Sequence, residues 1–308
     1  MKKKILVILG GNSKEREISL KSGKACIKAL KDLKHKTQIF DPAKTHFSQL
    51  KNYKADLIFN SLHGKDGEDG IAQSYFEFFK FPYTHSGVLS SMNAMNKIIS
   101  KEIFKKNKIL SPNSFSVNSV NFSELRIKKK IKSLKIKYPL VVKPSDEGSS
   151  IGVRICKNYN ALKKNTKELL NEYKSLIVEK FIGGQEIQVA VINGKALGAI
   201  ELKPKRNFYD YKAKYSKGAK TKHIMPANLS KKKYSEVLNL ATKAHKALKC
   251  RGVTRSDFKF ENNRFWILET NTQPGMTDLS LVPEIARYRG ITFKKLVESI
   301  IRDASINK

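Results

Sequence analysis

Two neighbouring segments near the C-terminal end of the chain carry oxygen-bearing side chains at alternating positions. Glu269 and Asn271 end the apolar run 264–271, and a Gln-Pro-Gly sequence begins two residues later, at Gln273. Upstream, Asp257 lies in a second run, 252–260, that is rich in aromatic and β-branched residues. Both runs are typical of strands, in which alternate side chains share a face. Carboxylate and amide oxygens on one face form a hard-oxygen site suited to Mg²⁺, which proteins bind together with substrate phosphates.

The length of the turn between these strands decides whether the two acids meet. The connector is Glu-Asn-Asn-Arg. A three-residue loop, 262–264, places Asp257 directly opposite Glu269, whereas a two-residue Asn-Asn turn pairs Asp257 with Leu268 and sends the acids to opposite faces. A metal site therefore predicts the longer loop. The alternative is a polar, solvated sheet face on which Arg255 and Asp257 form a surface ion pair.

The composition is that of a globular protein with a very basic surface. The chain has 308 residues, of which 40% are hydrophobic and 29% charged, and a formal net charge of +34. Its length suffices for two or three compact units. Most of the 61 basic residues are lysines scattered along the chain in runs no longer than three. This dispersal, without interleaved aromatic residues, favours a solvated surface over a nucleic-acid interface.

Several features bear on the compartment. No apolar run approaches the roughly 20 residues of a membrane helix, so no membrane span is expected. The apolar stretch 5–9 follows a basic start but is shorter than a signal-peptide core of at least about 7 residues, and it predicts a first buried strand. The three cysteines are widely spaced and form no CxxC pair. They predict neither a disulfide framework nor a zinc site, and they fit a reducing cytoplasm.

Strand and helix signals alternate through the first 90 or so residues. The predicted elements are strands at 4–9 and 55–61 and a helix at 19–33. A further helix is expected to begin near Gly70, with Ile71, Tyr75 and Phe78 spaced to pack inward. A βα repeat of this kind predicts a parallel, doubly wound α/β unit.

A second region opens with a predicted helix at 93–106. It continues with the strand Tyr-Pro-Leu-Val-Val-Lys-Pro, the loop Glu-Gly-Ser-Ser-Ile-Gly at 147–152, and another strand. Small residues in this loop would let backbone N–H groups close over phosphates, and a plain flexible hairpin is the alternative.

The third region opens with the clearest hairpin in the chain. Strands at 186–192 and 195–202 flank an Asn-Gly turn. A helix at 231–249, with Ser230 as its cap, then leads into the pair of strands that carry the acids.

Eight motifs occur in a fixed order along the chain. They are GGNSKEREISLKSG, HGKDGEDG, MNK, VVKPSDEGSSIGV, VEKFIGGQE, FYDYKAKY, RSDF and LETNTQPGMTDLSLVP. Together they resemble D-alanine:D-alanine ligase of the ATP-grasp superfamily over essentially the entire chain. The resemblance implies an α/β ATP-grasp fold, with an N-terminal doubly wound parallel-sheet domain at 1–95, a central ATP-grasp subdomain at 96–182 and a C-terminal one at 183–308. It also implies ATP and two Mg²⁺ or Mn²⁺ ions as cofactors.

The same resemblance implies a set of nucleotide and metal contacts. Asp257, Glu269 and Asn271 match the family's ligands for the two metal ions. Lys97 and Lys143 match its phosphate-contacting lysines. The remaining nucleotide contacts that it implies are Ser149 and Ser150 in the loop over the triphosphate, Glu179 and Ile182 at the adenine, Lys180 in the same motif, Glu186 at the ribose, and Phe208 and Lys214 in or beside the flexible lid.

Amino-acid contacts follow in the same way. Glu15 matches the residue that orients the first D-alanine, hydrogen-bonded in the family to Ser149 and Tyr215. His63 matches a residue near that substrate, and its alternative is a satisfied loop histidine. Donors to the developing oxyanion are matched by Arg255 and the backbone of Gly275, and the second substrate's carboxylate site by Ser280 and Leu281. The implied catalytic set is Glu15, Ser149, Tyr215, Arg255, Gly275 and Ser280.

The implied reaction joins two D-alanine molecules through a D-alanyl phosphate, for peptidoglycan precursor synthesis. Metals and lysines offset phosphate charge, and a closed lid keeps water from the acyl phosphate. A ligase of the same architecture that makes D-alanyl-D-lactate is the nearest rival, and Tyr215 favours the amine acceptor. A basic nucleic-acid-binding protein is the other rival, supported by net charge alone. A homodimer is expected from the family alone. The residues themselves favour a cytoplasmic protein without nucleic-acid or membrane partners.

Overall fold

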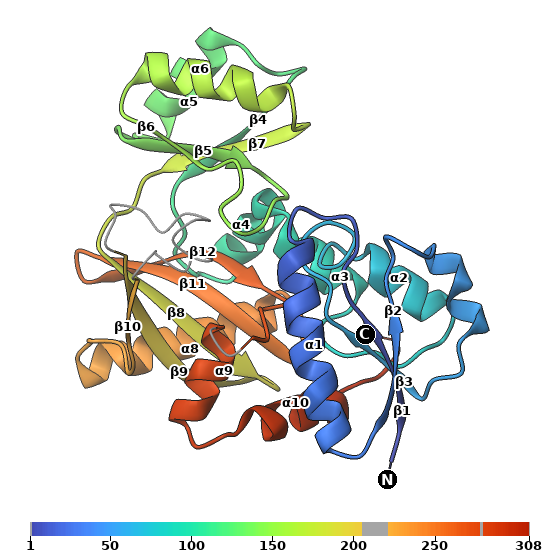
Figure 1. Ribbon diagram of the computed structural model, residues 1–308. Helices are drawn as coiled ribbons and strands as arrows, with labels where there is room; N and C mark the ends of the chain where they lie inside the picture. The colour runs from blue at the N-terminus through green and yellow to red at the C-terminus, as the bar shows by residue number, and fades with distance from the viewer. Residues whose placement is uncertain (1, 205–220, 278–279, 308) are drawn as a thin grey trace.

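The computed structural model describes residues 2–204, 221–277 and 280–307. Figure 1 shows three bodies, each built around a sheet. The first and third lie side by side, and the second stands above the third.

The first body is a parallel sheet covered on both faces. Its strands β1 (Lys4–Ile8), β2 (Lys36–Phe40) and β3 (Leu57–Asn60) lie in the order β2-β1-β3. Its helices are α1 (Arg16–Asp32), the 3-10 helix η1 (Phe47–Asn52) and α2 (Ile71–Phe78). In β1, Ile5 and Val7 face one hydrophobic cluster and Leu6 and Ile8 face another. Burial on both faces explains why this strand reads as an unbroken apolar run.

The predicted inward face of α2 is wrong for two of its three residues. Ile71 is 44% exposed and Phe78 is 77% exposed. Phe76 is fully buried instead, and Tyr75 stacks on Phe47 with ring centroids 5.0 Å apart. The helix is apolar on several sides, so spacing alone does not select the face that packs.

The predicted helix 93–106 is two helices. They are α3 (Val88–Met95) and α4 (Lys97–Lys106). Asn96 between them has an extended backbone, with φ −79° and ψ 104°, and its side chain accepts hydrogen bonds from the amides of Ile98 and Ile99. Because asparagine caps a helix in this way, Lys97 becomes the first residue of α4.

The second body is an antiparallel sheet with both of its helices on one face. Its strands β4 (Ser114–Asn118), β5 (Leu140–Pro144), β6 (Arg154–Cys156) and β7 (Ser175–Lys180) lie in the order β4-β7-β5-β6. Helices α5 (Glu124–Ser133) and α6 (Tyr159–Leu170) cover one face (Figure 1). Val142 and Val178 pack beneath them. Since strand side chains alternate, Lys143 and Glu179 point to the opposite face.

The third body is a five-stranded antiparallel sheet. Its strands are β8 (Gln185–Ile192), β9 (Lys195–Lys203), β10 (Lys222–Ile224), β11 (Val253–Glu261) and β12 (Arg264–Asn271), in the order β10-β9-β8-β11-β12. Its helices are α8 (Lys231–Ala247), α9 (Leu281–Tyr288) and α10 (Phe293–Arg302). The predicted Asn193-Gly194 turn joins β8 to β9, and Ser230 caps α8 by accepting from the amide of Lys233.

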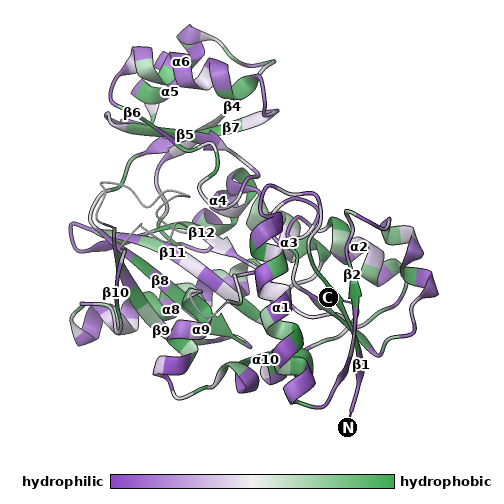
Figure 2. Cartoon of the chain, viewed as in Figure 1, coloured by the Kyte–Doolittle hydropathy of each residue, from purple (hydrophilic) through white to green (hydrophobic). Residues whose placement is uncertain are grey.

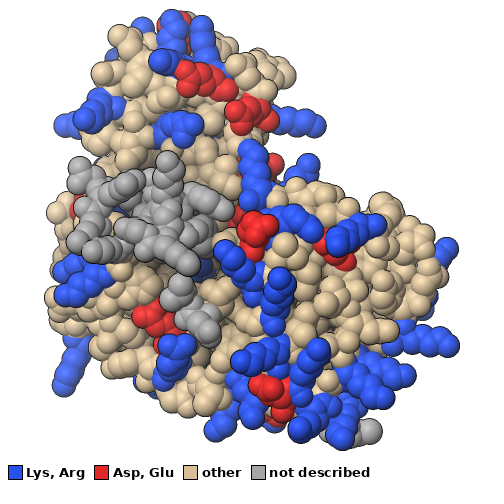
Figure 3. Space-filling view, in the orientation of Figure 1, with Lys and Arg blue, Asp and Glu red and all other residues tan. Residues whose placement is uncertain are grey.

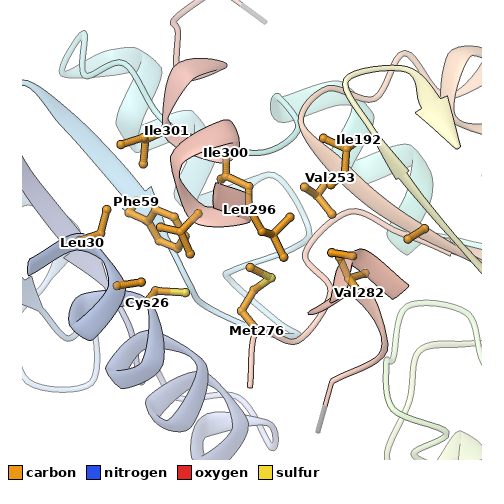
Figure 4. Close-up of a cluster of buried hydrophobic side chains, with 14 of the residues drawn as sticks. Cys26, Leu30, Phe59, Ile192, Val253, Met276, Val282, Leu296, Ile300 and Ile301 are labelled. Atoms are coloured by element: carbon orange, nitrogen blue, oxygen red, sulfur yellow. The ribbon is translucent and has the colours of Figure 1, made fainter. Parts of the chain in front are cut away.

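The first and third bodies share one hydrophobic core. Figure 4 shows Cys26, Leu30 and Phe59 of the first body facing Met276 and Leu296 of the third. The chain end returns to the first body, where Ser305 forms a bridge with Tyr83. The second body has a separate core. The loop after β1 is therefore fixed relative to the β11–β12 hairpin.

The distribution of hydropathy agrees with these cores. Figure 2 shows hydrophobic residues along the strands of the third body, while outward helix turns are hydrophilic. Across the described ranges of the chain, no helix combines the length and the apolar character that crossing a membrane requires.

Candidate active site

The hairpin of β11 and β12 brings the predicted metal ligands to one face. Asp257 pairs directly with Glu269. The neighbouring pair on that face joins Arg255 with Asn271. All of these side chains therefore project from the same side of the hairpin.

The predicted three-residue loop is wrong, although the pairing of the two acids is present. The strands are joined by a two-residue turn, Asn262 and Asn263, with φ of 50° and 62°. The register shifts by one residue at Leu268, which has no direct partner on β11. This β-bulge brings Asp257 opposite Glu269.

The bulge also allows residues at odd positions of β12 to point to both faces of the sheet. Phe265 and Ile267 are buried in the core under the sheet, at 3% and 0% exposure. In a regular strand they would share a face with Glu269 and Asn271, because all four occupy odd positions. The extra residue at Leu268 reverses the alternation, so one strand can both fill the core and supply the site.

Arg255 forms a two-pronged ion pair with Asp257. Its Nε lies 2.8 Å from Oδ1, and its Nη2 lies 3.0 Å from Oδ2. The side chains are 15% and 8% exposed. The ion pair expected from the alternative interpretation therefore exists, but it is largely buried and not on a solvated face.

Lys97 joins the hairpin to the loop of the second body. Its Nζ lies 3.3 Å from Oε2 of Glu269 and donates to the carbonyl of Glu147 at 2.6 Å. Its backbone amide donates to the carbonyl of Ser145 at 2.7 Å. The break before α4 aims this lysine at the site.

A buried acid and two lysines lie at the other wall. Nζ of Lys143 is 2.6 Å from Oε1 of Glu179, and Nζ of Lys101 is 2.9 Å from Oε2. Burial opposes ionisation of Glu179, but the two ammonium groups outweigh it and lower the pKa of the carboxyl to about 2. Burial in turn lowers the pKa of Lys101. Lys101 was not among the residues predicted from the sequence, although it lies one helical turn from Lys97 on α4.

A cleft lies between the second and third bodies, with about 780 Å³ of empty space when the adjoining open solvent is included. Its lining includes the charged residues Lys97, Asp257 and Glu269 as well as the apolar residues Val141 and Leu268. A lining of both kinds suits a ligand that has an apolar base and a polyanionic tail. The predicted nucleotide contacts that line the cleft are Lys97, Lys143, Ser150, Glu179, Lys180, Ile182 and Glu186.

A smaller cavity of about 390 Å³ opens beside this cleft. It is lined by Glu15, Glu68, Lys97, Ser149, Glu269 and Asn271, among others. Ser149 donates a hydrogen bond to the carboxylate of Glu15, across the gap between the first and second bodies. A Cβ at Gly148 would lie 2.7 Å from Oε2 of Glu15, so a larger residue there would require the Glu15 carboxylate to shift.

His63 lies below this cavity with both ring nitrogens engaged. Nδ1 is 3.2 Å from Oε1 of Glu68, and Nε2 is 3.1 Å from Oγ of Ser22. These contacts are those of a satisfied loop histidine, and the place of His63 near the first substrate stays a prediction. Glu68 reaches the cavity, and burial raises the pKa of its carboxyl to about 7. Glu68 belongs to the HGKDGEDG motif but was not singled out from the sequence.

The predicted acceptor end is formed where α9 begins. Ser280 precedes Leu281, the first residue of the helix, and its Oγ accepts from the amide of Thr277 at 3.0 Å. A Cβ at Gly275 would lie 2.9 Å from this hydroxyl. A helix N-terminus with a hydroxyl beside it is suited to a carboxylate.

Comparison with known proteins decides the family. The family model described as "D-ala D-ala ligase C-terminus" matches residues 104–302. The chain is 53% identical over 308 residues to the D-alanine–D-alanine ligase of Pelagibacter ubique strain HTCC1062, with 100% of both chains covered. The chain belongs to the D-alanine–D-alanine ligase family.

Solved structures agree with this family assignment. The Bacillus anthracis D-alanine–D-alanine ligase complexed with ATP superposes with a TM-score of 0.84 at 30% identity, covering 98% of this chain and 97% of that one. The VanG D-Ala:D-Ser ligase of Enterococcus faecalis gives 0.84 at 27% identity, covering 98% and 99%. The predicted ATP-grasp fold of this ligase family is confirmed.

The donor set of this ligase fits a hard divalent cation. Asp257, Glu269 and Asn271 supply two carboxylates and one amide oxygen on one face. Within residues 2–204, 221–277 and 280–307, no three His, Cys, Asp or Glu side chains gather as a metal cluster. Mg²⁺ is usually bound by one or two carboxylates together with substrate phosphates, and these three side chains fit the protein's share of such a site.

Three of the predicted contacts cannot be located in this ligase. Phe208, Lys214 and Tyr215 lie outside the described residues. In the sequence they fall between β9 and β10.

Proposed function

We propose that the protein catalyses the ATP-dependent ligation of two D-alanine molecules to D-alanyl-D-alanine for peptidoglycan precursor synthesis. The observation that supports this most strongly is the junction of the two cavities. Lys97 and Glu269 line both of them. A phosphate held at this junction would therefore face an amino acid held in the smaller cavity, as transfer from ATP to a carboxylate requires.

The reaction has two steps. The carboxylate oxygen of the first D-alanine attacks the γ-phosphorus of ATP, the bond to the bridging oxygen breaks, and ADP leaves. The amine of the second D-alanine then attacks the carbonyl of the acyl phosphate, loses a proton and expels phosphate. Lys97 and Lys143 offset phosphate charge, and Glu15, positioned by Ser149, holds the ammonium of the first D-alanine.

The second half-reaction uses the acceptor end of the site. Arg255 and the amide of Gly275 donate to the oxyanion that forms at the carbonyl. The carboxylate of the second D-alanine binds at Ser280 and Leu281. His63 orients the wall of the first-substrate cavity through Glu68.

The nucleotide lies with its adenine against Glu179, Lys180 and Ile182 and its ribose at Glu186. Asp257, Glu269 and Asn271 would hold two Mg²⁺ or Mn²⁺ ions, and the ions would supply positive charge that neutralises the phosphates. The predicted lid contacts, Phe208, Lys214 and Tyr215, complete the set.

We further propose the division at residues 95 and 182, a homodimer, and a cytoplasmic location. These rest on the family relationship and on the arrangement of the sequence motifs. Sedimentation analysis of the purified protein would test the dimer.

The function is tested by measuring phosphate release from ATP and Mg²⁺ with D-alanine, with product identification by mass spectrometry. L-alanine alone, D-alanine with D-lactate, and D-alanine with D-serine serve as comparison acceptors. Release with D-alanine alone, giving D-alanyl-D-alanine, is the expected result. Turnover that depends on D-lactate or D-serine would keep the chemistry and overturn the acceptor.

A further inference from the structure

Lys259 is a charged residue of the nucleotide cleft to which the sequence motifs assign no role. It lies on β11 two positions after Asp257 and lines the same cleft. Its direct partner on β8 is Glu186, and its Nζ is 3.1 Å from Oε2 of that carboxylate. The two side chains are only 15% and 13% exposed, so the pair is largely screened from solvent.

The position of Lys259 along its strand places it between the two ends of the nucleotide. Asp257, at the phosphate end, precedes it by two residues, about 7 Å along a strand. Glu261 follows it by two residues and accepts from the amide of Gly183, which directly follows Ile182 at the adenine end. The sugar of a nucleotide that spans this cleft therefore lies over Lys259 and Glu186.

The Glu186 carboxylate is held on both of its oxygens. Gln188 donates to Oε1 at 3.4 Å, which is a long bond, while Lys259 contacts Oε2 at 3.1 Å. The lysine is the closer and the charged partner, so it fixes the carboxylate more strongly. Without it, a partly buried anion would also face an anionic triphosphate.

We propose that Lys259 is a positioning residue that determines specificity for ribonucleotides. Its ammonium holds the Glu186 carboxylate in the orientation that accepts hydrogen bonds from the ribose hydroxyls. This inference rests on the proposed function, because it takes Glu186 as the ribose contact. The predicted consequence is a nucleotide selectivity that a lysine with a merely structural role would not produce.

The test compares Lys259→Met with the wild type, by calorimetric binding of ADP, 2′-deoxy-ADP and 3′-deoxy-ADP. Methionine keeps most of the side-chain length and removes the charge. We expect ADP to bind about tenfold more weakly, because a hydrogen bond to a charged group is lost. We also expect the preference for ADP over at least one deoxy analogue to shrink. Lys195→Met, at an exposed strand lysine of the same sheet, is the matched control and should bind like the wild type.

A double-mutant cycle and a rescue variant sharpen the test. If Lys259 acts through Glu186, Lys259→Met should cost little further affinity in a Glu186→Gln background. Lys259→Arg should restore most of the preference. In steady-state assays, the KM for ATP should rise more than kcat falls.

Two results would overturn the proposal. Unchanged ADP affinity in Lys259→Met would remove the residue from nucleotide binding. If ADP binds more weakly but the ratio of its affinity to that of each deoxy analogue is unchanged, the charge of Lys259 acts on the phosphates instead of the ribose. Failure of the proposed function would look different, since the wild type would bind ADP yet form no D-alanyl-D-alanine.

Discussion

Glu269 lines both cavities and is paired with Asp257 across the hairpin. We expect Glu269→Ala to reduce Mg²⁺-dependent ligation by at least about a hundredfold, because a preorganised charge at the phosphates is lost. The protein should stay folded, since the side chain is 23% exposed. Phosphate release and thermal unfolding measure the two effects. Glu298→Ala, on the outer face of α10, is the control, and near-normal turnover in Glu269→Ala would remove Glu269 from the site.

Glu68 makes the free energy of unfolding depend on pH, and a mutation at this residue can isolate its contribution. Burial is the main reason that its pKa rises from 4.5 to about 7, with Glu15 adding to the shift and His63 opposing it. The folded protein thus holds this proton more tightly than the unfolded chain does. Its contribution to stability is therefore complete below about pH 4.5 and is lost as the pH rises through about 7.

The matched variant is Glu68→Gln, which keeps the shape and cannot ionise. We expect the free energy of unfolding of the wild type, relative to this variant, to fall by about 3 kcal/mol between pH 4.5 and 7.5. Urea unfolding across this range measures the difference. An exposed residue, Glu17, changed to Gln should show no such trend. Parallel pH profiles for the wild type and Glu68→Gln would contradict the burial argument.

Most of the side chains that line the cleft were predicted from residue types and spacing. Lys101, which contacts Glu179 in that lining, was not. A lysine is rarely buried, so its type alone predicts solvent exposure. Its burial depends on the second oxygen of Glu179, which lies on β7, far later in the sequence. A partner so distant in sequence leaves no local pattern to read.

At the scale of elements, the β11–β12 hairpin shows where sequence reasoning is limited. Local turn chemistry favours a two-residue Asn-Asn turn, and the structure has this turn. The bulge at Leu268 was missed because an apolar residue in an apolar run resembles any other strand position. A signal was present, since Phe265 and Ile267 have the same parity as Glu269 and a regular strand cannot bury two of them and display the third.

The turn can be tested through its backbone angles. Asn263 has a φ of 62°, which asparagine and glycine tolerate better than other residues. We expect Asn263→Ala to lower the free energy of unfolding by about 1 kcal/mol. Asn263→Gly should be neutral or stabilising, because Asn-Gly is the preferred pair for this turn. Chemical denaturation of both variants measures the effect. Equal stability of the two would contradict the two-residue turn.

The same limit applies to predicting the helices and turns from the sequence. Strong local signals, such as Ser230 before α8 and Asn193-Gly194 between β8 and β9, agree with the structure. The break at Asn96 was missed because the apolar pattern continues across it. Local chemistry thus defined the ends of elements well, whereas the choice of a packed face on α2 depended on the shape of the whole body.

At the scale of the molecule, the residues of the site come from two units with separate hydrophobic cores: the first and third bodies, which share one core, and the second body, which has its own. The first and third bodies fix Glu15 relative to Glu269 through one hydrophobic cluster. The second body, with its own cluster, supplies Lys143, Glu179 and the loop that contains Ser149. Ligands in the two cavities therefore contact elements from all three bodies, and their binding should oppose separation of the second body from the other two.

The net charge of +34 also acts on the whole molecule. Figure 3 shows Lys and Arg side chains spread over all three bodies on the visible face, with no single stripe. Like charges confined to a compact surface repel one another more than they do in an expanded chain. Salt screens this repulsion over a Debye length of about 10 Å at 0.1 M.

We therefore expect the thermal unfolding midpoint to rise as NaCl increases from about 10 mM to about 200 mM, because screening relieves the compact state more than the unfolded one. Differential scanning calorimetry in a fixed dilute buffer measures the shift. A succinylated sample, in which lysine charges are reversed in part, is the control and should lose the trend as its net charge approaches zero. A midpoint that falls with salt would mean that ion pairs such as Arg16–Asp41 outweigh the general repulsion.

The same salt series on immobilised DNA distinguishes a generally basic surface from a specific nucleic-acid interface. Retention that disappears at moderate salt is the expected result for dispersed lysine.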